Sequence, residues 1–166
     1  MLLKPNIKLD RVTDITPAIL KKYNINSLIL DVDNTLSTHH GQVLTDGLPE
    51  WLVNMRNSGI GMIILSNSKE QRVKTFAEKI NLPYISLGLK PLPFRYISAL
   101  KRLGNKRNNT AIVGDQIFTD VLGGNIVGIK TILLDPIKLE TTSGFVFKRK
   151  IERGVYKLYK IKNTEE

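Results

Sequence analysis

Hydrophobic residues in this chain gather in short, unbroken runs, and the segments between the runs have helical spacing. Five runs rich in aliphatic and β-branched residues occupy positions 27–31, 61–66, 84–87, 110–115 and 130–135. Since these runs are continuous rather than alternating, they are typical of strands that are covered on both faces. The pattern therefore predicts a parallel sheet at the centre of the domain.

Helix signals separate these runs. Thr16 and Pro17 have the residue types of an N-cap and a first helical position, and Ser68 with Gln71 matches a capping box. A further helix is expected over residues 93–103, because basic residues occupy its last turn and a glycine follows. Strand and helix alternate throughout, so we predict one doubly wound, Rossmann-like α/β domain with helices on both faces of a parallel sheet.

The last segment of the chain has a different character. Between residues 148 and 162, seven residues are basic and one is acidic. Apolar residues recur there at helical spacing: Phe147, Ile151, Val155, Leu158 and Ile161. We therefore divide the chain into a core with an N-terminal lead segment, residues 1–140, and a basic amphipathic tail, residues 141–166. The favoured interpretation is that the apolar stripe packs on the domain's own core, and contact with a membrane surface or an acidic partner is the alternative.

Composition and charge narrow the classes of function. The chain has 166 residues and no cysteine, which excludes disulfides, zinc–thiolate sites and a thiolate nucleophile. Its net charge of +10 favours an anionic partner, such as a phosphorylated substrate, an anionic membrane surface or nucleic acid. Nucleic acid is the least favoured, because aromatic residues interleave with basic ones only at Tyr156 and Tyr159. With no signal peptide and no membrane span, we expect a cytoplasmic protein that is at most peripheral at the inner face of the membrane.

Polar and charged residues follow the predicted strands, where ligands bind in an open parallel sheet. They are Asp31, Asp33, Ser66, Asn67, Lys90, Asp115 and Asp120. Asp31 and Asp33 share one side of an extended chain, and Asp115 would add a third carboxylate nearby. Oxygen ligands of this kind favour a hard cation, above all Mg²⁺. One carboxylate can then attack phosphorus while the other handles the proton.

The same strand ends supply groups that bind phosphate. The hydroxyl of Ser66 and the amides after it are expected at a helix N-terminus, which attracts anions, and Lys90 adds a positive charge. His39 and His40 are adjacent, but no cysteine and no third histidine accompany them. We therefore interpret the pair as an exposed loop rather than a metal site.

Four motifs in order, "DVDNT", "SNS", "KP" and "GDQIFTD", resemble those of the haloacid dehalogenase (HAD) superfamily of phosphatases. The resemblance implies an Mg²⁺-dependent phosphohydrolase in which Asp31 is the nucleophile and forms an aspartyl-phosphate. Asp33 is then the general acid toward the leaving group and afterwards the base for the attacking water. Asp115 ligates Mg²⁺ together with Asp31 and the backbone carbonyl of Asp33.

The remaining motif residues have supporting roles under the same resemblance. Ser66, Asn67 and Lys90 bind the phosphoryl group, while Thr35 and Asp120 stabilise the residues that do the chemistry. The match extends from about Leu28 to Asp135 and implies a single HAD core.

A narrower resemblance extends over nearly the whole chain. The stretches "LLKPNIKLDRVTDITPAILKKYNINSLILDVDNTL" and "GDQIFTDVLGGNIVGIKTILLDPI" look like the bacterial YqeG group of subfamily IIIA. That group is similar to the mitochondrial phosphatidylglycerophosphate phosphatase, so the resemblance implies an anionic phospholipid as the phosphomonoester substrate. The segments that follow Asp33 and Ser66 are too short to hold a large cap domain, and an open site suits a large substrate such as a lipid headgroup.

The sequence is also compatible with other functions. The same chemistry serves soluble metabolites or the phosphorylated ends of polynucleotides, with a neighbouring subunit of an oligomer enclosing the site. A binding or assembly protein that keeps the phosphate site without turnover is a third hypothesis, although the presence of both Asp31 and Asp33 argues against it.

Overall fold

The apolar runs form the strands of one sheet. The computed structural model describes residues 1–38 and 40–164. Within them the strand order is β1-β6-β5-β2-β3-β4, and every pairing is parallel. The strands are β1 (Ile7–Lys8), β2 (Ser27–Leu30), β3 (Gly61–Leu65), β4 (Tyr84–Ile85), β5 (Thr110–Gly114) and β6 (Lys130–Leu133). The five predicted strands are confirmed, whereas β1 is too short to leave a hydrophobic run in the sequence.

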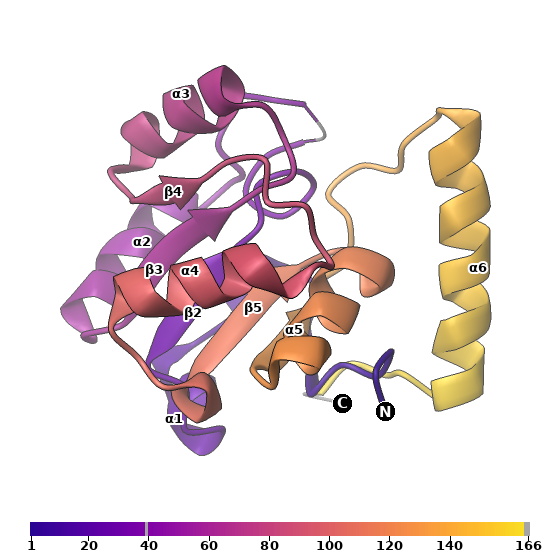
Figure 1. Cartoon of the computed structure of the whole chain (residues 1–166), viewed down its shortest axis with the longest axis horizontal. Helices are drawn as coiled ribbons and strands as arrows, with labels where there is room; N and C mark the ends of the chain where they lie inside the picture. The colour runs from indigo at the N-terminus through magenta and orange to yellow at the C-terminus, as the bar shows by residue number, and fades with distance from the viewer. Residues whose placement is uncertain (39, 165–166) are drawn as a thin grey trace.

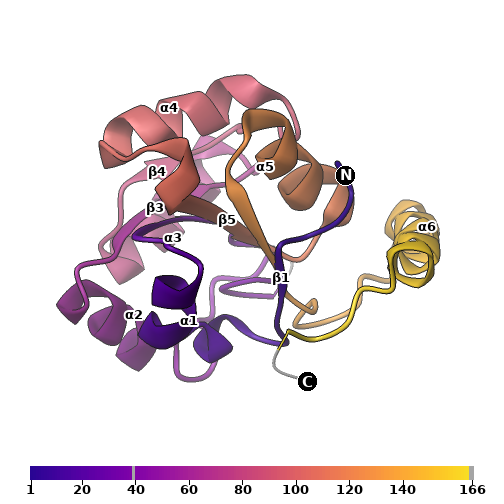
Figure 2. The ribbon, with the colours of Figure 1, turned by 90° about the horizontal axis from the view of Figure 1, so that it is seen from below.

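Helices cover both faces of this sheet (Figures 1 and 2). They are η1 (Val12–Asp14), α1 (Pro17–Lys22), α2 (Leu48–Asn57), α3 (Glu70–Ile80), α4 (Pro93–Leu103), η2 (Arg107–Asn109), the π-helical turn η3 (Ile117–Val121), α5 (Leu122–Val127) and α6 (Ser143–Tyr159).

Alternation along β2 explains why both faces are covered. Leu28 and Leu30 pack with Trp51 of α2 and with α3 on one face, while Ile29 packs with Tyr96 of α4 on the other. Side chains along a strand alternate in direction, so a strand with consecutive apolar residues, such as Leu28, Ile29 and Leu30, needs a helical layer on each side. The predicted doubly wound, Rossmann-like α/β fold is therefore confirmed.

The helix boundaries follow the sequence signals with one exception. The Thr16 hydroxyl accepts a hydrogen bond from the Ile19 amide at 3.2 Å and so caps α1 as expected. The capping box at Ser68 is wrong, because the residue before α3 is Lys69 and the Ser68 hydroxyl instead donates to Asp33 at 2.9 Å. This serine is drawn into the polar end of the sheet rather than into its own helix.

The tail forms α6, which lies beside the sheet and its helical layers (Figures 1 and 2). Val155 is buried against η3 and β6, but Phe147, Ile151 and Leu158 are 66%, 44% and 73% exposed. The expectation that the whole apolar stripe packs on the core is therefore wrong. The division between core and tail at residue 140 stays a proposal.

The end of the described chain is fastened to the sheet edge. The Thr164 amide donates to the Lys8 carbonyl at 2.8 Å, and the Lys8 amide donates to the Thr164 hydroxyl at 2.8 Å. α6 is thus held at both of its ends, by the segment after β6 and by this contact with β1. None of the helices in the described residues has the length and hydropathy needed to cross a lipid bilayer.

Candidate active site

The polar residues after three neighbouring strands meet at one edge of the sheet. Asp31 follows β2, Ser66 follows β3 and Asp115 follows β5, and β2 lies between the other two strands. The Asp31 amide donates to the carbonyl of Val113 at 2.9 Å, which extends the β2–β5 ladder as far as the aspartate. The fold thus brings together the residues that the sequence placed at strand ends.

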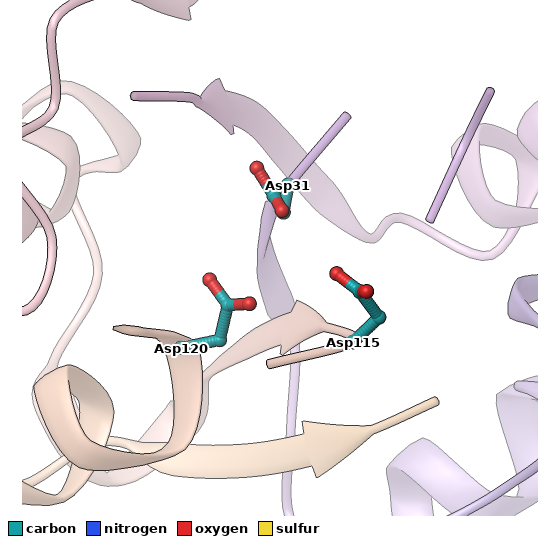
Figure 3. A group of neighbouring side chains, drawn as sticks. All are labelled: Asp31, Asp115 and Asp120. Atoms are coloured by element: carbon teal, nitrogen blue, oxygen red, sulfur yellow. The ribbon is translucent and has the colours of Figure 1, made fainter. Parts of the chain in front are cut away.

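Three carboxylates form the centre of this site (Figure 3). Oxygen atoms of Asp31, Asp115 and Asp120 lie within 4.8 Å of one another, and all three side chains are buried. The Oδ1 atom of Asp115 is buried and has no hydrogen-bond partner in the structure. An all-oxygen donor set with an unsatisfied carboxylate oxygen fits a hard divalent cation such as Mg²⁺.

Lys90 bridges two of these carboxylates. Its Nζ atom lies 2.8 Å from Asp31 Oδ1 and 2.7 Å from Asp120 Oδ1. Burial lowers the pKa of a lysine, but the charges of Asp120 and Asp31 outweigh it and raise the pKa of Lys90. The ammonium group is therefore permanently charged at the place where a phosphoryl group would lie.

The contact with Lys90 does not bring the pKa of Asp31 back to its ordinary value. Burial raises the pKa of Asp31 to about 7, with Lys90 opposing the shift and Asp120 adding to it. Burial likewise raises the pKa of Asp115 well above its usual range, against the opposing charge of Arg149. A cation in the cluster would favour the ionised forms of both groups.

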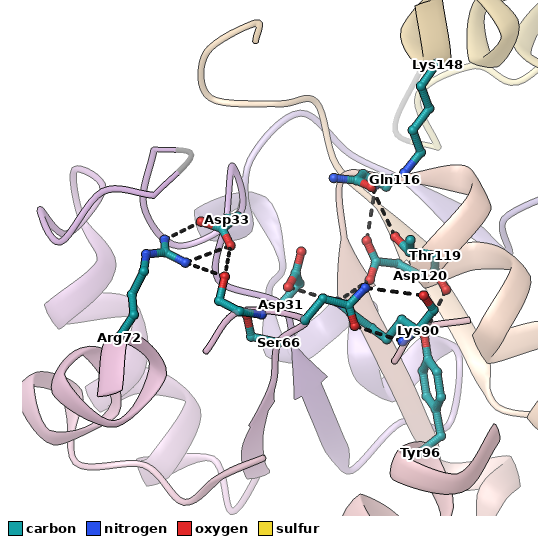
Figure 4. Close-up of polar contacts among 12 residues, drawn as sticks. Asp31, Asp33, Ser66, Arg72, Lys90, Tyr96, Gln116, Thr119, Asp120 and Lys148 are labelled. Atoms are coloured by element: carbon teal, nitrogen blue, oxygen red, sulfur yellow. Dashed lines mark hydrogen bonds and ion pairs between the residues drawn. The ribbon is translucent and has the colours of Figure 1, made fainter. Parts of the chain in front are cut away.

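Asn67 and Asp33 have different partners in this site, and Figure 4 shows Asp33 beside Arg72. The Asn67 side chain accepts from the Lys90 amide at 2.8 Å and donates to the Lys90 carbonyl at 3.3 Å, so it holds the backbone that carries the lysine. The Asp33 carboxylate accepts from Arg72 through both oxygens and from the His40 amide at 2.8 Å. The side chain of Asp33 therefore lies with Arg72 and outside the group of three carboxylates.

Arg72 sets the ionisation of Asp33. Burial alone would raise the pKa of Asp33, but the hydrogen bonds from Arg72 and from the His40 amide outweigh it and lower the pKa below its usual value. In this arrangement Asp33 is an ionised carboxylate, which is the form required of a base. To donate a proton it has to leave Arg72 and face a leaving group.

Arg149 of α6 contacts the third carboxylate of the site, that of Asp115. Its guanidinium group pairs with Asp115 Oδ2 and donates to the Asp115 carbonyl at 2.8 Å. It also contacts Glu140 Oε1 at 3.1 Å and Glu152 Oε2 at 2.9 Å. Only one carboxylate oxygen of Asp115 is used in these contacts, so Arg149 orients the carboxylate and leaves its Oδ1 atom without a hydrogen-bond partner.

The turn after β5 is shaped by a close backbone contact. A Cβ atom on Gly114 would lie 2.2 Å from the carboxylate of Asp120, which no side chain tolerates. Asp120 belongs to the π-helical turn η3, and its Oδ2 atom accepts from the Gln116 amide at 3.2 Å. The glycine thus makes room for the carboxylate that contacts Lys90.

A cavity of about 510 Å³ opens above these residues. Its walls come from the strand ends, α3 and the first turns of α6: Asp31, Asp33, His40, Asn67, Ser68, Lys69, Arg72, Lys90, Gln116, Thr119, Phe145 and Lys148. Ser66 is fully buried beneath it and accepts from the Ser68 amide at 3.2 Å. Thr35 lies at a separate cavity beside residues 10–13, and its hydroxyl is buried with no hydrogen-bond partner.

The histidine pair is only partly described. His40 is exposed, as expected of a loop, and contributes its backbone amide to Asp33. His39 lies outside the described residues. The contribution of this loop to the site is therefore a main-chain hydrogen bond to a carboxylate.

Arg72 and Arg149 were missed by reasoning from the sequence. Arg72 lies one helical turn after Ser68, so a basic residue on the inner side of the helix after the second motif was the available signal. Arg149 stands among many basic residues of the tail, and nothing in its spacing distinguishes it from its exposed neighbours. Its role depends on the path of the chain between β6 and α6.

A parallel sheet with paired aspartates after its central strand and a lysine between carboxylates defines the class of HAD-like hydrolases. The HAD-hydrolase-like family model matches residues 89–136. The chain is 36% identical over 160 residues to "Probable phosphatase YqeG" of Bacillus subtilis (strain 168), covering 95% of this chain and 92% of the relative. The chain belongs to the YqeG family of HAD phosphatases.

A more distant relative and two solved structures agree with this class. "Ribulose-1,5-bisphosphate 5-phosphatase" of Halopiger xanaduensis is 28% identical over 96 residues, covering 52% of this chain and 40% of that protein. An uncharacterized protein from Listeria monocytogenes serotype 4b has the same fold at a TM-score of 0.57 and 18% identity, covering 82% and 100% of the two chains. NagD from E. coli K-12 follows at 0.57 and 14%, covering 72% and 93%. The two structures support the HAD core fold.

Proposed function

We propose that this phosphatase is Mg²⁺-dependent, acts through an aspartyl-phosphate on Asp31, and takes phosphatidylglycerophosphate as its substrate. The observation that supports the mechanism most strongly is the position of Asp31, beside Lys90 and within the group of three carboxylates. The cavity opens directly over Asp31 and Lys90, so a phosphate group can reach both.

The proposed reaction has two displacements at phosphorus. A carboxylate oxygen of Asp31 attacks the phosphorus atom and the bond to the ester oxygen breaks. Asp33, which takes up a proton from solvent once it has left Arg72, gives that proton to the ester oxygen. Asp33 then takes a proton from water, the water oxygen attacks phosphorus, and the bond to Asp31 breaks to release inorganic phosphate. Lys90 stabilises the negative charge of the phosphoryl group through both steps, with Asn67 holding its backbone.

Mg²⁺ would be held by Asp31 and Asp115, with the backbone carbonyl of Asp33 as a further ligand. When bound, it neutralises the carboxylates and the phosphate so that two anions can approach each other. Asp120 contacts Lys90 rather than solvent, so we assign it the role of orienting the lysine. Ser66, buried beneath Ser68, and Thr35, at the separate cavity, have supporting roles in this proposal.

The form of the cavity supports a lipid headgroup as substrate. Besides Lys90, its walls carry Lys69, Arg72 and Lys148, so a substrate with a second anionic group beyond the reacting phosphate meets complementary charge. Phosphatidylglycerophosphate carries a phosphodiester in addition to its terminal phosphate. We propose that the protein works on this substrate as a peripheral protein at the inner face of the membrane.

Phosphate release from phosphatidylglycerophosphate in mixed micelles tests this proposal. Soluble phosphomonoesters and a 3′-phosphorylated oligonucleotide serve as competing substrates, and each is measured with Mg²⁺ and with EDTA. The Asp31→Asn variant is the catalytic control, and Val53→Gln, an exposed position on α2, is the matched surface control.

We expect preference for the lipid, with activity abolished by EDTA and by Asp31→Asn and unchanged by Val53→Gln. Activity restricted to soluble esters or the oligonucleotide would overturn the substrate and leave the mechanism. Turnover by Asp31→Asn at the rate of the native chain would overturn the mechanism itself.

A further inference from the structure

α6 packs on the core through a mixed face, in which Arg149 and Glu152 lie beside Val155, Tyr156 and Tyr159. Arg149 and Glu152 are buried toward the core at 8% and 3% exposure, with Val155 beside them. The inner face is held by ion pairs among Arg149, Glu152 and the carboxylates of Asp115 and Glu140, and by the hydrogen bond from the Ile117 amide to Glu152 at 2.9 Å. Packing of this helix therefore does not require its other apolar residues.

Those other apolar residues form a row on the opposite side of α6. Phe147, Ile151 and Leu158 follow one another at helical spacing with Gly154 between them, so the four positions share one face. We call Phe147, Ile151 and Leu158 the outward row. All three side chains are exposed, and they lie opposite the face that carries Arg149 and Glu152. Apolar side chains gathered on an exposed helix face indicate a binding surface rather than core packing.

A line of cations runs beside the outward row. Lys150, Arg153 and Lys157 have the same helical spacing, and all three are exposed. We call these three residues the basic stripe. Their charges join those of a chain with a net charge of +10. A row of apolar side chains flanked by lysine and arginine is complementary to an anionic lipid surface, where the row enters the acyl boundary and the stripe contacts headgroups.

We propose that the outward row and the basic stripe of α6 dock the protein on an anionic phospholipid bilayer. A second copy of this chain fits the surface less well, because two basic stripes would face each other with like charge. Nucleic acid would leave the apolar row without a partner. The proposal deepens the function argued above by placing Lys148 and Phe145, which line the catalytic cavity, on the helix that contacts the membrane.

Co-sedimentation of the full chain with lipid vesicles tests the docking surface. Vesicles of phosphatidylcholine with phosphatidylglycerol are compared with vesicles of phosphatidylcholine alone. One variant changes the outward row to glutamine (Phe147→Gln, Ile151→Gln, Leu158→Gln), which keeps helix propensity and alters only exposed positions. The matched control changes three exposed apolar residues on other helices (Val53→Gln, Phe94→Gln, Ile126→Gln).

We expect the native chain to bind the anionic vesicles, with partitioning at least about tenfold weaker for the outward-row variant and unchanged for the control. Each substitution by glutamine in the basic stripe should weaken binding to anionic vesicles by about fivefold. Equal binding by the outward-row variant, or no binding of the native chain, would overturn the proposal. So would a dimer in sedimentation velocity that the outward-row variant dissociates.

The docking test is separate from the test of function. Binding needs no turnover, so the Asp31→Asn variant should bind vesicles as the native chain does. The outward-row variant should hydrolyse a soluble phosphomonoester at the native rate, because none of its three positions lines the catalytic cavity. Vesicle binding without phosphate release would overturn the lipid substrate alone, and release in micelles without vesicle binding would overturn the docking surface alone.

Discussion

At the scale of single residues, the site is a set of buried carboxylates whose positions are fixed by three cations. Lys90 lies between Asp31 and Asp120, Arg72 holds Asp33, and Arg149 holds Asp115. Arg149 leaves the Oδ1 atom of Asp115 without a hydrogen-bond partner, whereas Arg72 contacts both oxygens of Asp33. Removal of one cationic side chain should therefore disturb only the carboxylates that it contacts and leave the rest of the site in place.

Arg149→Gln gives the sharpest test of such a positioning role. Without the guanidinium group Asp115 is free to rotate, so we expect the apparent affinity for Mg²⁺ in the phosphatase assay to fall by about 10–100-fold. Arg153→Gln, on the exposed side of the same helix, is the matched control and should leave the Mg²⁺ dependence unchanged.

Arg149→Lys keeps the positive charge but loses the planar guanidinium group. Partial recovery of the Mg²⁺ affinity in this variant would show that charge supplies part of the effect and the orientation of Asp115 by the guanidinium group supplies the rest. Glu140 and Glu152 also lose a partner in Arg149→Gln, so we expect the melting temperature to fall, and it is measured alongside the Mg²⁺ dependence. A variant that is destabilised but keeps the native Mg²⁺ dependence would show that Arg149 stabilises the fold without positioning Asp115.

Gly114→Ala tests the close contact behind Lys90. The added Cβ atom would meet the Asp120 carboxylate at 2.2 Å, so Asp120 or the strand end has to move and Lys90 loses a partner. We expect activity to fall by about 100-fold, the size typical of a misplaced catalytic group. Gly144→Ala, where a Cβ atom meets nothing within 4 Å, is the control, and equal activity of the two variants would refute the contact.

The sequence predicted which carboxylates and which lysine meet, but not how their charges are arranged. Asp31, Asp115 and Lys90 were identified because strand ends of a parallel sheet share an edge, which is a rule of topology. Arg72 and Arg149 act across long distances in the sequence, and no periodic pattern links either arginine to its carboxylate. Ser68 was misassigned because a serine before a helix is an N-cap in most contexts, and here Asp33 competes for its hydroxyl.

At the scale of elements, five of the six strands in the described residues followed from the sequence, whereas the buried face of α6 did not. In β2, β3 and β5 the residues after the first position are consecutively apolar and buried, which requires a sheet covered on both faces. The tail has a helical pattern as well, but a helical pattern shows only that one face is apolar, not which face is buried. In α6 the face that carries Arg149 and Glu152 is the buried one. Asp115 after β5 and Glu140 after β6 need a cationic partner, and Arg149 supplies it.

Gly154 lies in the exposed middle of α6 and supplies a prediction at this scale. A Cβ atom there meets nothing within 4 Å, and its backbone is helical, so Gly154→Ala lowers the conformational entropy of the unfolded chain without a clash. We expect the free energy of unfolding to rise by about 0.5–1 kcal/mol, measured by urea denaturation. A decrease would mean that α6 is not helical at this position.

At the scale of the whole molecule, the fold holds an excess of buried acid beside a surface that is strongly basic. The net charge of +10 lies on a chain whose catalytic cavity is lined by Asp31 and Asp33 as well as by lysines and Arg72, so an anionic substrate that the cations attract also meets carboxylates that repel it. A divalent cation in the carboxylate cluster would resolve this conflict. It would make the site receptive to phosphate, and it would remove the cost of ionising Asp31 and Asp115 where they are buried.

The stability of the protein should therefore depend on pH and on Mg²⁺ together. Since the pKa of Asp31 is raised from 3.8 to about 7, the folded chain binds more protons than the unfolded chain between these values, and metal-free stability falls as pH rises through that window. Mg²⁺ binds only the ionised carboxylates, so protons compete with it below about pH 7. Differential scanning fluorimetry should show a larger gain in Tm from Mg²⁺ at about pH 8 than at about pH 6, since affinity at the lower pH is weaker by about tenfold. Asp31→Asn removes one of the two carboxylates with raised pKa values and should reduce this difference, whereas an equal Mg²⁺ effect at both pH values in the native chain would show that the ion does not bind at Asp31.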